Sequence, residues 1–341
     1  MNKLRCAVIG CGRIGCGFDD ISNGIIKTHA GSYYQNNDTK LVSLCDIDSK
    51  KLKKYGDKYN VSGLYTKSLE MFQKESIQIV SICTLVETHL DLVKQAAKFN
   101  VKAIFLEKPI STSLKDAKKI IEICNKNNIL LIVDHQRRFD PFYQKIKLLV
   151  KNKKIGKIQK VNVYYGSGVS NTGSHLFDLL RMFFGEIKFL ESNFSKNISN
   201  NIKDPNVEIK LEFLNKINCT IHGLDYRNYA LFEMDIIGTL GRMRLDLVSH
   251  KIEYFKIDNK NSLVYHKLKP SNISISRSKY SPIQLAIKNL INSLSSKNNS
   301  LCTGLDGYKS LELIIASLSS ANINKKISLP ILNNNYKIGS K

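Results

Sequence analysis

Five short apolar runs stand out in the first 135 residues of the chain. Valine, isoleucine and leucine fill these runs without the strict alternation of a half-exposed strand, and this is typical of parallel strands that are buried on both faces. The runs lie at residues 4–10, 40–46, 76–84, 103–109 and 129–135. We therefore predict a parallel sheet in this part of the chain.

The segments between these runs have the period of helices. Residues 89–100 and 113–128 each place apolar side chains largely on one side of a helix. Strands that alternate with helices of this length indicate βαβ units. The pattern predicts an α/β Rossmann domain, a doubly wound parallel sheet, over residues 1–135.

The pattern changes after about residue 145, where partly alternating runs follow one another with short polar connections. These runs lie at residues 157–168, 207–214, 217–224, 229–238, 241–247, 251–257 and 262–268. Their alternation is typical of an antiparallel sheet with one face packed. Helical spacing occurs at 174–185, 281–294 and 307–321. We predict an α+β domain with a large, mostly antiparallel sheet over residues 136–335.

Composition narrows the class of protein. The chain has 341 residues, of which 43% are hydrophobic, and no apolar run approaches the length of a membrane helix. The N-terminus lacks the long apolar region of a signal peptide. Eight cysteines with no zinc spacing suit a reducing compartment and predict no metal site. These features predict a cytoplasmic protein without a membrane partner.

The formal net charge of +23 raises the question of nucleic-acid binding. The lysines are spread along the whole chain, and no recognition helix, zinc finger or aromatic RNA-binding motif accompanies them. The charge is therefore predicted to favour small anionic ligands, and no nucleic-acid partner is expected.

The first motif with chemical meaning is Gly10-Cys11-Gly12-Arg13-Ile14-Gly15, directly after the first predicted strand. In that position, glycines allow a tight turn and a close approach of the backbone to a pyrophosphate, with the N-terminus of the next helix directed at the anion. An ordinary glycine-rich turn between strand and helix would also fit.

Asp46 ends the second predicted strand, where an acidic residue accepts hydrogen bonds from the adenosine ribose and disfavours a 2′-phosphate. This favours NAD, while Lys50 and Lys51 keep NADP open. The spacing of 31 positions from Gly15 to Asp46 exceeds the usual spacing of about 20. The excess is predicted to be a loop inserted at residues 16–31. A turn or capping aspartate would also fit Asp46.

Glu107-Lys108-Pro109 follows the fourth predicted strand, at the edge of the sheet where ligands bind in open α/β folds. A lysine there can bind a substrate hydroxyl and stabilise the alkoxide that forms as hydride leaves, with Glu107 orienting the ammonium. Pro109 can fix the turn through a cis bond. A surface pair before a helix-entry proline is the alternative.

A second candidate group lies at the predicted helix 174–185. Ser174 is expected to cap this helix, with Asn171 in the loop before it and His175 in its first turn. A histidine can take the proton of a substrate hydroxyl, and Asp178, one turn later, can orient the imidazole. A histidine that is merely packed at a helix start fits equally well.

Taken together and in this order, AVIGCGRIG, CDID, VSICTLVETH, EKP, QRRFDP and GSHLFDLLRMFFG resemble the glucose–fructose oxidoreductase/inositol dehydrogenase/rhizopine catabolism (Gfo/Idh/MocA) family. The resemblance implies a Rossmann domain followed by an α+β domain, a bound nicotinamide cofactor, and a sugar, cyclitol or nucleotide-sugar substrate. It also implies a homodimer or homotetramer formed through the C-terminal sheet.

The same resemblance assigns roles to individual residues. Lys108 and His175 are the implied catalytic pair, with Asn171 as a third catalytic residue, and both Lys108 and His175 are also implied to contact substrate, Lys108 the cofactor as well. Thr84, His89, Glu107 and Arg137 are implied to bind the cofactor with the glycine motif and Asp46, and Arg138 and Asn171 to bind substrate.

The sequence departs from the family pattern at three positions. Asn171 stands where many members have Asp, Leu85 follows Thr84 where proline is usual, and Gln136 replaces an asparagine. Asn171 is similar to members that act on nucleotide-linked sugars. Two other functions are compatible with the resemblance, namely a redox-neutral sugar enzyme with bound NAD and a non-catalytic sensor of NAD or sugar.

Overall fold

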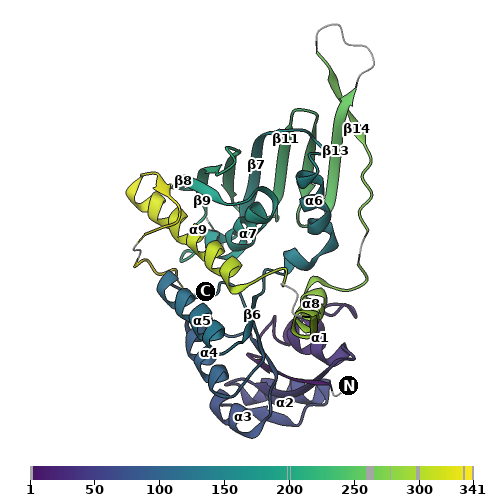
Figure 1. Cartoon of the computed structure of the whole chain (residues 1–341), viewed down its shortest axis with the longest axis vertical. Coiled ribbons are helices and arrows are strands. Elements are labelled where there is room, and N and C mark those ends of the chain that lie inside the picture. Colours follow the sequence, from purple (N-terminus) through teal and green to yellow (C-terminus); the bar gives the residue numbers. More distant parts are fainter. Residues whose placement is uncertain are drawn as a thin grey trace. The chain divides into compact units, whose positions relative to one another are not determined.

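The apolar runs of the N-terminal half form one six-stranded parallel sheet in a computed structural model (Figure 1). The structure describes residues 3–197, 199, 201–258, 265–276, 278–296, 300–332 and 335–339. The sheet has the order β3-β2-β1-β4-β5-β6. Its strands are β1 (Leu4–Ile9), β2 (Thr39–Cys45), β3 (Gly63–Tyr65), β4 (Ile79–Ile82), β5 (Ala103–Leu106) and β6 (Leu130–Val133). This is the doubly wound order of dinucleotide-binding domains, as predicted.

Helices cover the two faces of this sheet through their apolar sides. Leu92, Val93 and Ala96 are buried on α4, and Ala117 and Ile120 on α5, as their spacing predicted. The helices of this part are α1 (His29–Gln35), α2 (Ser49–Tyr59), α3 (Ser68–Lys74), α4 (His89–Lys98) and α5 (Leu114–Lys126), with 3-10 turns η1 (Gly17–Asp20), η2 (Val86–Thr88) and η3 (Gln136–Phe139).

The first crossover leaves the usual path after Gly15 and returns at α1. The N–H groups of His29 and Ala30 donate to the carbonyl oxygens of Ile14 and Gly15, at 3.2 and 2.9 Å. α1 therefore begins at His29, and these two bonds join it to the glycine motif. The inserted segment that was predicted at residues 16–31 is an excursion of residues 16–28. This excursion accounts for the long spacing between Gly15 and Asp46.

The second half of the chain forms a nine-stranded, mostly antiparallel sheet, as predicted, in the order β14-β13-β12-β11-β7-β10-β9-β8-β15. Burial alternates along its strands, so that one face is packed. The strands are β7 (Ile158–Gly166), β8 (Ile187–Phe194), β9 (Val207–Phe213), β10 (Asn218–Leu224), β11 (Glu233–Gly238), β12 (Gly241–Asp246), β13 (Lys251–Asp258), β14 (Lys267–Ser271) and β15 (Ile327–Ser328). Residues 262–264 of the predicted strand 262–268 lie outside the described residues.

The remaining helices are α6 (Pro141–Lys151), the π-helical turn η4 (Gly168–Thr172), α7 (Gly173–Phe184), α8 (Pro282–Ser296) and α9 (Gly304–Ile323). The chain divides into two compact units, one of residues 1–140 and 278–309 and the other of residues 141–277 and 310–339. Residues 278–309 thus belong with the Rossmann sheet, and not with the second domain as predicted, because α8 packs against η3 and α1.

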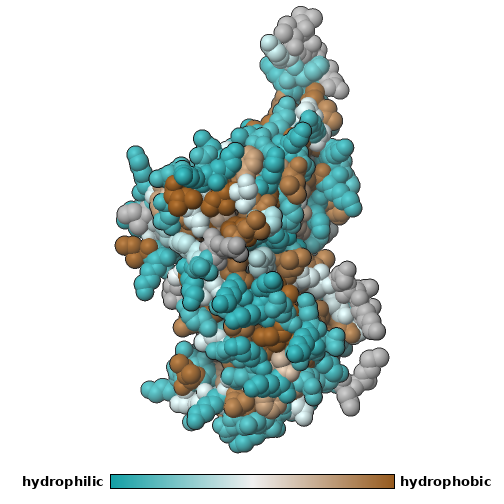
Figure 2. Space-filling view, turned by 60° about the vertical axis from the view of Figure 1, so that its left-hand side comes forward, coloured by the Kyte–Doolittle hydropathy of each residue, from teal (hydrophilic) through white to brown (hydrophobic). Residues whose placement is uncertain are grey.

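The surface agrees with the composition. Hydrophilic side chains predominate on the face shown in Figure 2, with smaller hydrophobic areas between them. No helix among the described residues is long and apolar enough to cross a membrane.

Candidate functional site

The glycine motif forms a turn that tolerates side chains at one position and not at others. Gly10 has φ +96°, and a Cβ there would lie 2.7 Å from the backbone carbon of Cys83, while a Cβ at Gly15 would collide with the carbonyl oxygen of Gly10. A Cβ at Gly12 would meet nothing within 4 Å. The turn is therefore tightly packed on its inner side and open at Gly12, and this suits the approach of a dinucleotide pyrophosphate.

Asp46 follows β2 and lies against this turn. Its Oδ2 accepts a hydrogen bond from the Cys11 N–H at 2.6 Å, and its Oδ1 accepts one from the Asp48 N–H at 2.9 Å. A carboxylate can accept more than one bond on each oxygen, so the half-buried Asp46 keeps acceptor capacity for ribose hydroxyls. The predicted role of Asp46 is compatible with this geometry.

A pocket of about 320 Å³ lies beside the open part of the turn. Its lining includes Gly12, Arg13, Phe18, Ile21, Lys51 and Tyr55. The Arg13 guanidinium lies 4.8 Å from the centre of the Phe18 ring. The excursion thus contributes an aromatic and an aliphatic side chain to a wall that also carries two cations.

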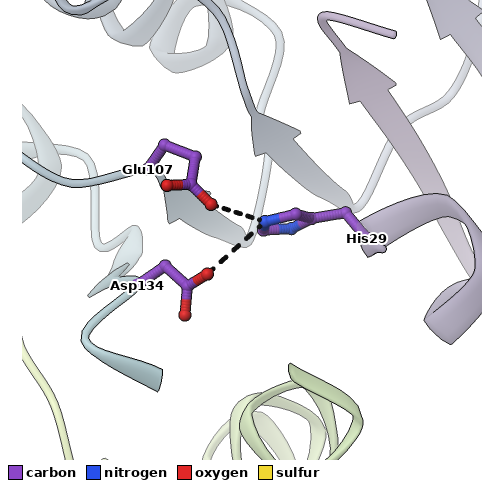
Figure 3. A group of neighbouring side chains, drawn as sticks. All are labelled: His29, Glu107 and Asp134. Carbon is purple, nitrogen blue, oxygen red and sulfur yellow. Dashed lines mark hydrogen bonds and ion pairs between the residues drawn. The ribbon is translucent and has the colours of Figure 1, made fainter. Parts of the chain in front are cut away.

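A second group of polar side chains lies at the carboxyl end of the same sheet (Figure 3). Glu107 follows β5, Asp134 follows β6, and His29 opens α1. Nε2 of His29 lies 3.1 Å from Oε1 of Glu107 and 3.7 Å from Oδ2 of Asp134. Their side chains are 0%, 13% and 1% exposed, respectively. The three residues form a buried acid–imidazole cluster.

This cluster perturbs both carboxyl groups in opposite directions. Burial alone would raise the pKa of Glu107, but the hydrogen bond with His29, together with smaller effects of Asp134 and Lys108, lowers it. Burial and the charge of Glu107 raise the pKa of Asp134 well above its usual range. Of the two carboxyl groups, Glu107 is therefore the one that favours the ionised form, and Asp134 the one that favours the protonated form.

One atom from each of the three residues lies within 4.8 Å of the others, so the cluster has the dimensions of a metal site. The separation of 3.1 Å between His29 and Glu107 is, however, that of a direct hydrogen bond. A shared proton fits these atoms better than an inserted cation.

Lys108 and Pro109 complete the edge after β5. Lys108 is half-buried, and its ammonium acts electrostatically on both Glu107 and Asp134. The Lys108–Pro109 peptide bond is cis, as predicted. The structure thus puts a cation at the position where the sequence predicts contact with substrate.

Two residues predicted to lie beside the cofactor follow β4. Thr84 is half-buried, and its hydroxyl lies 2.7 Å from that of Thr88. His89 is 1% exposed, and its ring nitrogens lie 3.3 Å from the carbonyl oxygens of Thr84 and Ile110. Burial lowers the pKa of His89, and the two carbonyl oxygens act in the opposite direction. It ties two loops together, and nothing in its contacts directs it at a ligand.

The two arginines after β6 differ. Arg137 is half-buried and acts electrostatically on Asp134. Arg138 forms an ion pair with Asp306 at 3.0 Å and donates to the Leu301 carbonyl at 3.2 Å. Through these two contacts Arg138 holds residues 301–306 in place, and its predicted contact with substrate stays a prediction.

In the second unit, Asn171 lies in η4 and His175 in the first turn of α7, both half-buried. Ser174 does not cap α7 as predicted, since it lies inside the helix and its hydroxyl donates to the Asn171 carbonyl. Asp204 instead accepts from the N–H groups of Ser170 and Asn171, at 2.7 and 2.9 Å. A residue 33 positions after Asn171 therefore shapes the backbone at the predicted catalytic turn.

Sequence reasoning did not identify His29, Asp134 or Asp204. Asp134 had a usable signal, because it is the first polar residue after the run ILLIV, as Asp46 and Glu107 are after theirs. His29 and Asp204 lie in polar segments without a periodic pattern, and only the fold brings them to their partners.

Family models match both halves of the chain. Residues 4–135 match the Gfo/Idh/MocA model described as an oxidoreductase family with an NAD-binding Rossmann fold. Residues 159–329 match the model for the C-terminal alpha/beta domain of the same oxidoreductase family.

Individual relatives match at low identity. The chain is 26% identical to D-apiose dehydrogenase of Rhizobium rhizogenes, over 94% of this chain and 96% of the relative. It is 32% identical to myo-inositol 2-dehydrogenase of Thermotoga maritima, over 45% of this chain and 42% of the relative. The crystal structure of the WlbA dehydrogenase of Bordetella pertussis, in complex with NADH and UDP-GlcNAcA, has a TM-score of 0.78 and 20% identity, and the match covers 97% of this chain and 100% of that one.

Proposed function

Because this chain belongs to the Gfo/Idh/MocA oxidoreductase family, we propose that it is an NAD-dependent dehydrogenase that oxidises a hydroxyl-bearing carbon of a sugar, cyclitol or nucleotide sugar. The observation that carries the proposal is the position of Lys108, which follows an ionised, buried Glu107 at the carboxyl edge of a doubly wound sheet. Ligands bind at this edge in open α/β folds.

The residues of the glycine turn fit the cofactor. Gly12 leaves its backbone open, Gly10 and Gly15 have no room for a side chain, and Asp46 retains acceptor capacity. In the proposal, Gly10, Gly12, Arg13, Ile14 and Gly15 hold the pyrophosphate, Asp46 binds the adenosine ribose, and Thr84 and Arg137 line the path toward Lys108. When bound, NAD⁺ supplies the acceptor for the hydride.

The side chains of the protein manage the proton in this scheme. The Lys108 ammonium donates a hydrogen bond to the substrate oxygen and stabilises the negative charge that develops on it. The His175 imidazole takes the hydroxyl proton, and returns it when the reaction runs in reverse. Asn171 binds a neighbouring hydroxyl through its amide, which can both donate and accept. Arg138 has no assigned role in this scheme, since two of its guanidinium nitrogens contact Asp306 and Leu301.

The substrate class is drawn from the relatives and from Asn171. Two relatives are named for D-apiose and myo-inositol, and the WlbA structure contains UDP-GlcNAcA. All three names denote polyhydroxylated molecules, so the proposal covers free and nucleotide-linked sugars. The net charge of +23 favours the anionic members of this set.

The first experiment is a search for bound cofactor. The protein is purified, denatured and analysed by mass spectrometry, and the stripped protein is then titrated with NAD and with NADP. Tighter binding of NAD supports the proposal. Binding of neither dinucleotide would refute it, and a preference for NADP would refute the role given to Asp46.

Turnover is then measured across a panel of aldoses, cyclitols and UDP-sugars by NADH absorbance. Lys108→Ala and His175→Ala are each expected to abolish turnover while NAD affinity stays within about threefold of the wild type, as for residues that act on the reacting atoms. Full activity in either variant would refute the mechanism. Product formation without net NADH would identify a redox-neutral reaction instead.

The proposed assembly is a homodimer or homotetramer formed through the nine-stranded sheet, in line with the resemblance noted above. Size-exclusion chromatography with light scattering measures it, and a monomer at micromolar concentration would exclude it.

A further inference from the structure

A continuous chain of buried polar groups leads from the interior of the Rossmann unit to Glu107. The Tyr33 hydroxyl lies 2.9 Å from the Ser81 hydroxyl, which lies 2.8 Å from Nδ1 of His29. Nε2 of His29 then reaches Glu107 at 3.1 Å. Tyr33, Ser81 and His29 are all fully buried. Such a network restricts the orientation of its last member because every group has a defined partner.

The chemistry of the groups sets the direction of these bonds. Burial raises the pKa of Tyr33 well above its usual range, so Tyr33 keeps its proton and can donate to Ser81. Ser81 can then donate to Nδ1 of His29, and Nε2–H donates to the carboxylate of Glu107. One consistent pattern therefore satisfies every donor and fixes the tautomer of His29.

Asp134 approaches the same end of the chain from β6. Among the described residues, its Oδ1 is buried and has no hydrogen-bond partner. An ionised carboxylate with an unpaired buried oxygen would be costly, and two adjacent carboxyl groups do not both ionise in such a site. Asp134 is therefore the neutral member of the pair and offers a proton to Glu107.

We infer that His29 is a positioning residue that, together with a protonated Asp134, holds Glu107 as an oriented carboxylate beside Lys108. Glu107 in turn attracts the ammonium of Lys108, which acts on it electrostatically. The inference rests on the proposed function only for the role of Lys108. The hydrogen-bonded network stands without it.

Three variants of His29 separate this role from simple packing. In His29→Gln, the side-chain amide can still reach Glu107 from the position of Nε2. His29→Asn keeps an amide only near Nδ1, toward Ser81, and His29→Leu keeps neither bond. We expect kcat to fall by about 10- to 100-fold in His29→Leu and His29→Asn, the scale of a misplaced reacting group, and to recover most of that loss in His29→Gln. NAD affinity is expected to change by less than about threefold.

Tyr143→Phe is a matched control in the other unit, because it also removes one buried hydrogen bond, at 2.9 Å to the Leu247 carbonyl. If Tyr143→Phe loses stability but keeps its kcat, the loss of one buried hydrogen bond is not by itself enough to lower kcat. Equal losses of kcat in His29→Gln and His29→Leu would overturn the inference, as would recovery in His29→Asn.

The pH profile gives a readout that a packing role would not change. Among the described residues, the titratable and charged groups that act on Glu107 or on its partner Asp134 include His29 and Tyr33 on α1, Lys108, Asp134, Cys83 after β4, His89 on α4 and Arg137 on η3. Without the bond from His29, burial dominates and the pKa of Glu107 rises. The acid limb of kcat/KM therefore moves to higher pH in His29→Leu, and a limb that stays in place would contradict the inference.

Asp134 offers two tests, of which the second, by infrared spectroscopy, does not require turnover. Asparagine can donate to Glu107 as a protonated carboxyl does, so Asp134→Asn is expected to keep roughly tenfold more activity than Asp134→Leu. Infrared spectroscopy at neutral pH should show a carboxylic-acid carbonyl band in the wild type that is lost in Asp134→Asn. Absence of that band, or stoichiometric bound zinc or manganese that is lost in His29→Leu, would overturn the inference. If the band is present but no substrate is turned over, the proposed function fails and the network stands.

Discussion

Asp46 and Glu107 occupy equivalent positions in the Rossmann sheet, yet their surroundings differ. Each is the first acidic residue after a buried parallel strand. Asp46 is half-buried and is held by backbone N–H groups, those of Cys11 and Asp48. Glu107 is held by two side chains, His29 and Asp134, and its own side chain is 13% exposed.

The difference shows how one sheet edge provides two kinds of carboxylate. Backbone donors fix Asp46 and leave it acceptor capacity for a ligand. Side-chain partners enclose Glu107, so that its charge acts on its neighbour Lys108 instead of on a ligand directly. The part of the sheet edge at Asp46, here called the open end, is thus suited to binding a ligand. The part at Glu107 and Lys108, here called the enclosed end, is suited to chemistry.

The largest effect is expected at the enclosed end. Lys108→Met removes the charge beside Glu107 and should lower kcat by about 10³-fold, the scale of losing a group that stabilises developing charge. Lys102→Met, an exposed residue before the opposite end of β5, serves as the control. Steady-state kinetics with NADH detection measure both, and a loss of NAD affinity equal to the loss of kcat would place Lys108 at the open end instead.

The glycine turn at the open end gives the next largest effect. Gly15→Ala forces a Cβ against the Gly10 carbonyl and should lower the free energy of unfolding by about 1–3 kcal/mol. Gly12→Ala meets no protein atom within 4 Å, so it should weaken NAD binding at nearly unchanged stability. Denaturant titration and calorimetry separate the two quantities. Equal destabilisation by both substitutions would mean that Gly12 is not open.

A smaller change is expected at Asp46 itself. Asp46→Asn keeps an acceptor but loses the charge, so the Kd for NAD should rise about tenfold and the preference over NADP should fall. Asp48→Asn, which alters the neighbouring cap of α2, should leave the preference unchanged. Fluorescence titration with both dinucleotides measures the ratio, and an unaltered ratio in Asp46→Asn would remove Asp46 from cofactor selection.

The smallest effect concerns the excursion beside the open end. Asp20 contacts Lys54, Lys58 and Tyr55 of α2, at 2.7, 2.6 and 3.1 Å. Its limited burial would raise the pKa of Asp20, but these three partners lower it to about 2. Because the folded pKa lies below the ordinary value of 3.8, the stabilisation is complete above about pH 4 and is lost as the pH falls through 2.

Asp20→Asn should therefore lower stability by only ~1 kcal/mol at pH 7, since exposed ion pairs are screened. The difference from the wild type should vanish near pH 2. Thermal unfolding across this range tests it, and a difference that persists at pH 2 would assign the effect to packing.

The sequence predicted both sheets because their strands obey simple rules. Strands buried on both faces are continuously apolar, and strands packed on one face alternate. The strands that escaped prediction break these rules. β3 has only three residues, and β8 buries the polar Ser192, whose hydroxyl donates to the Ser317 carbonyl. Partners more than 100 residues away satisfy that serine, and a local pattern does not reveal them.

The site was predicted unevenly for the same reason. The positions of Gly12, Asp46 and Lys108 follow from their place after a strand, which the sequence states. The direction of a side chain does not follow. Arg138 was predicted to face a substrate, but its partner Asp306 lies 168 residues further on. His29 is separated from its motif by the excursion, so its approach to Glu107 depends on chain closure.

Because its two ends are held together, the excursion of residues 16–28 is a suitable place to insert a tag or a label. The bonds from His29 and Ala30 back to Ile14 and Gly15 fix both of its ends, while its tip at Asn23 and Gly24 is exposed. The entropy of closing such a loop grows only slowly with its length. A short tag or a fluorophore inserted at the tip should therefore leave the fold intact. Since Phe18 and Ile21 of the excursion line the pocket beside Gly12, the fluorescence of such a label should change when the cofactor binds.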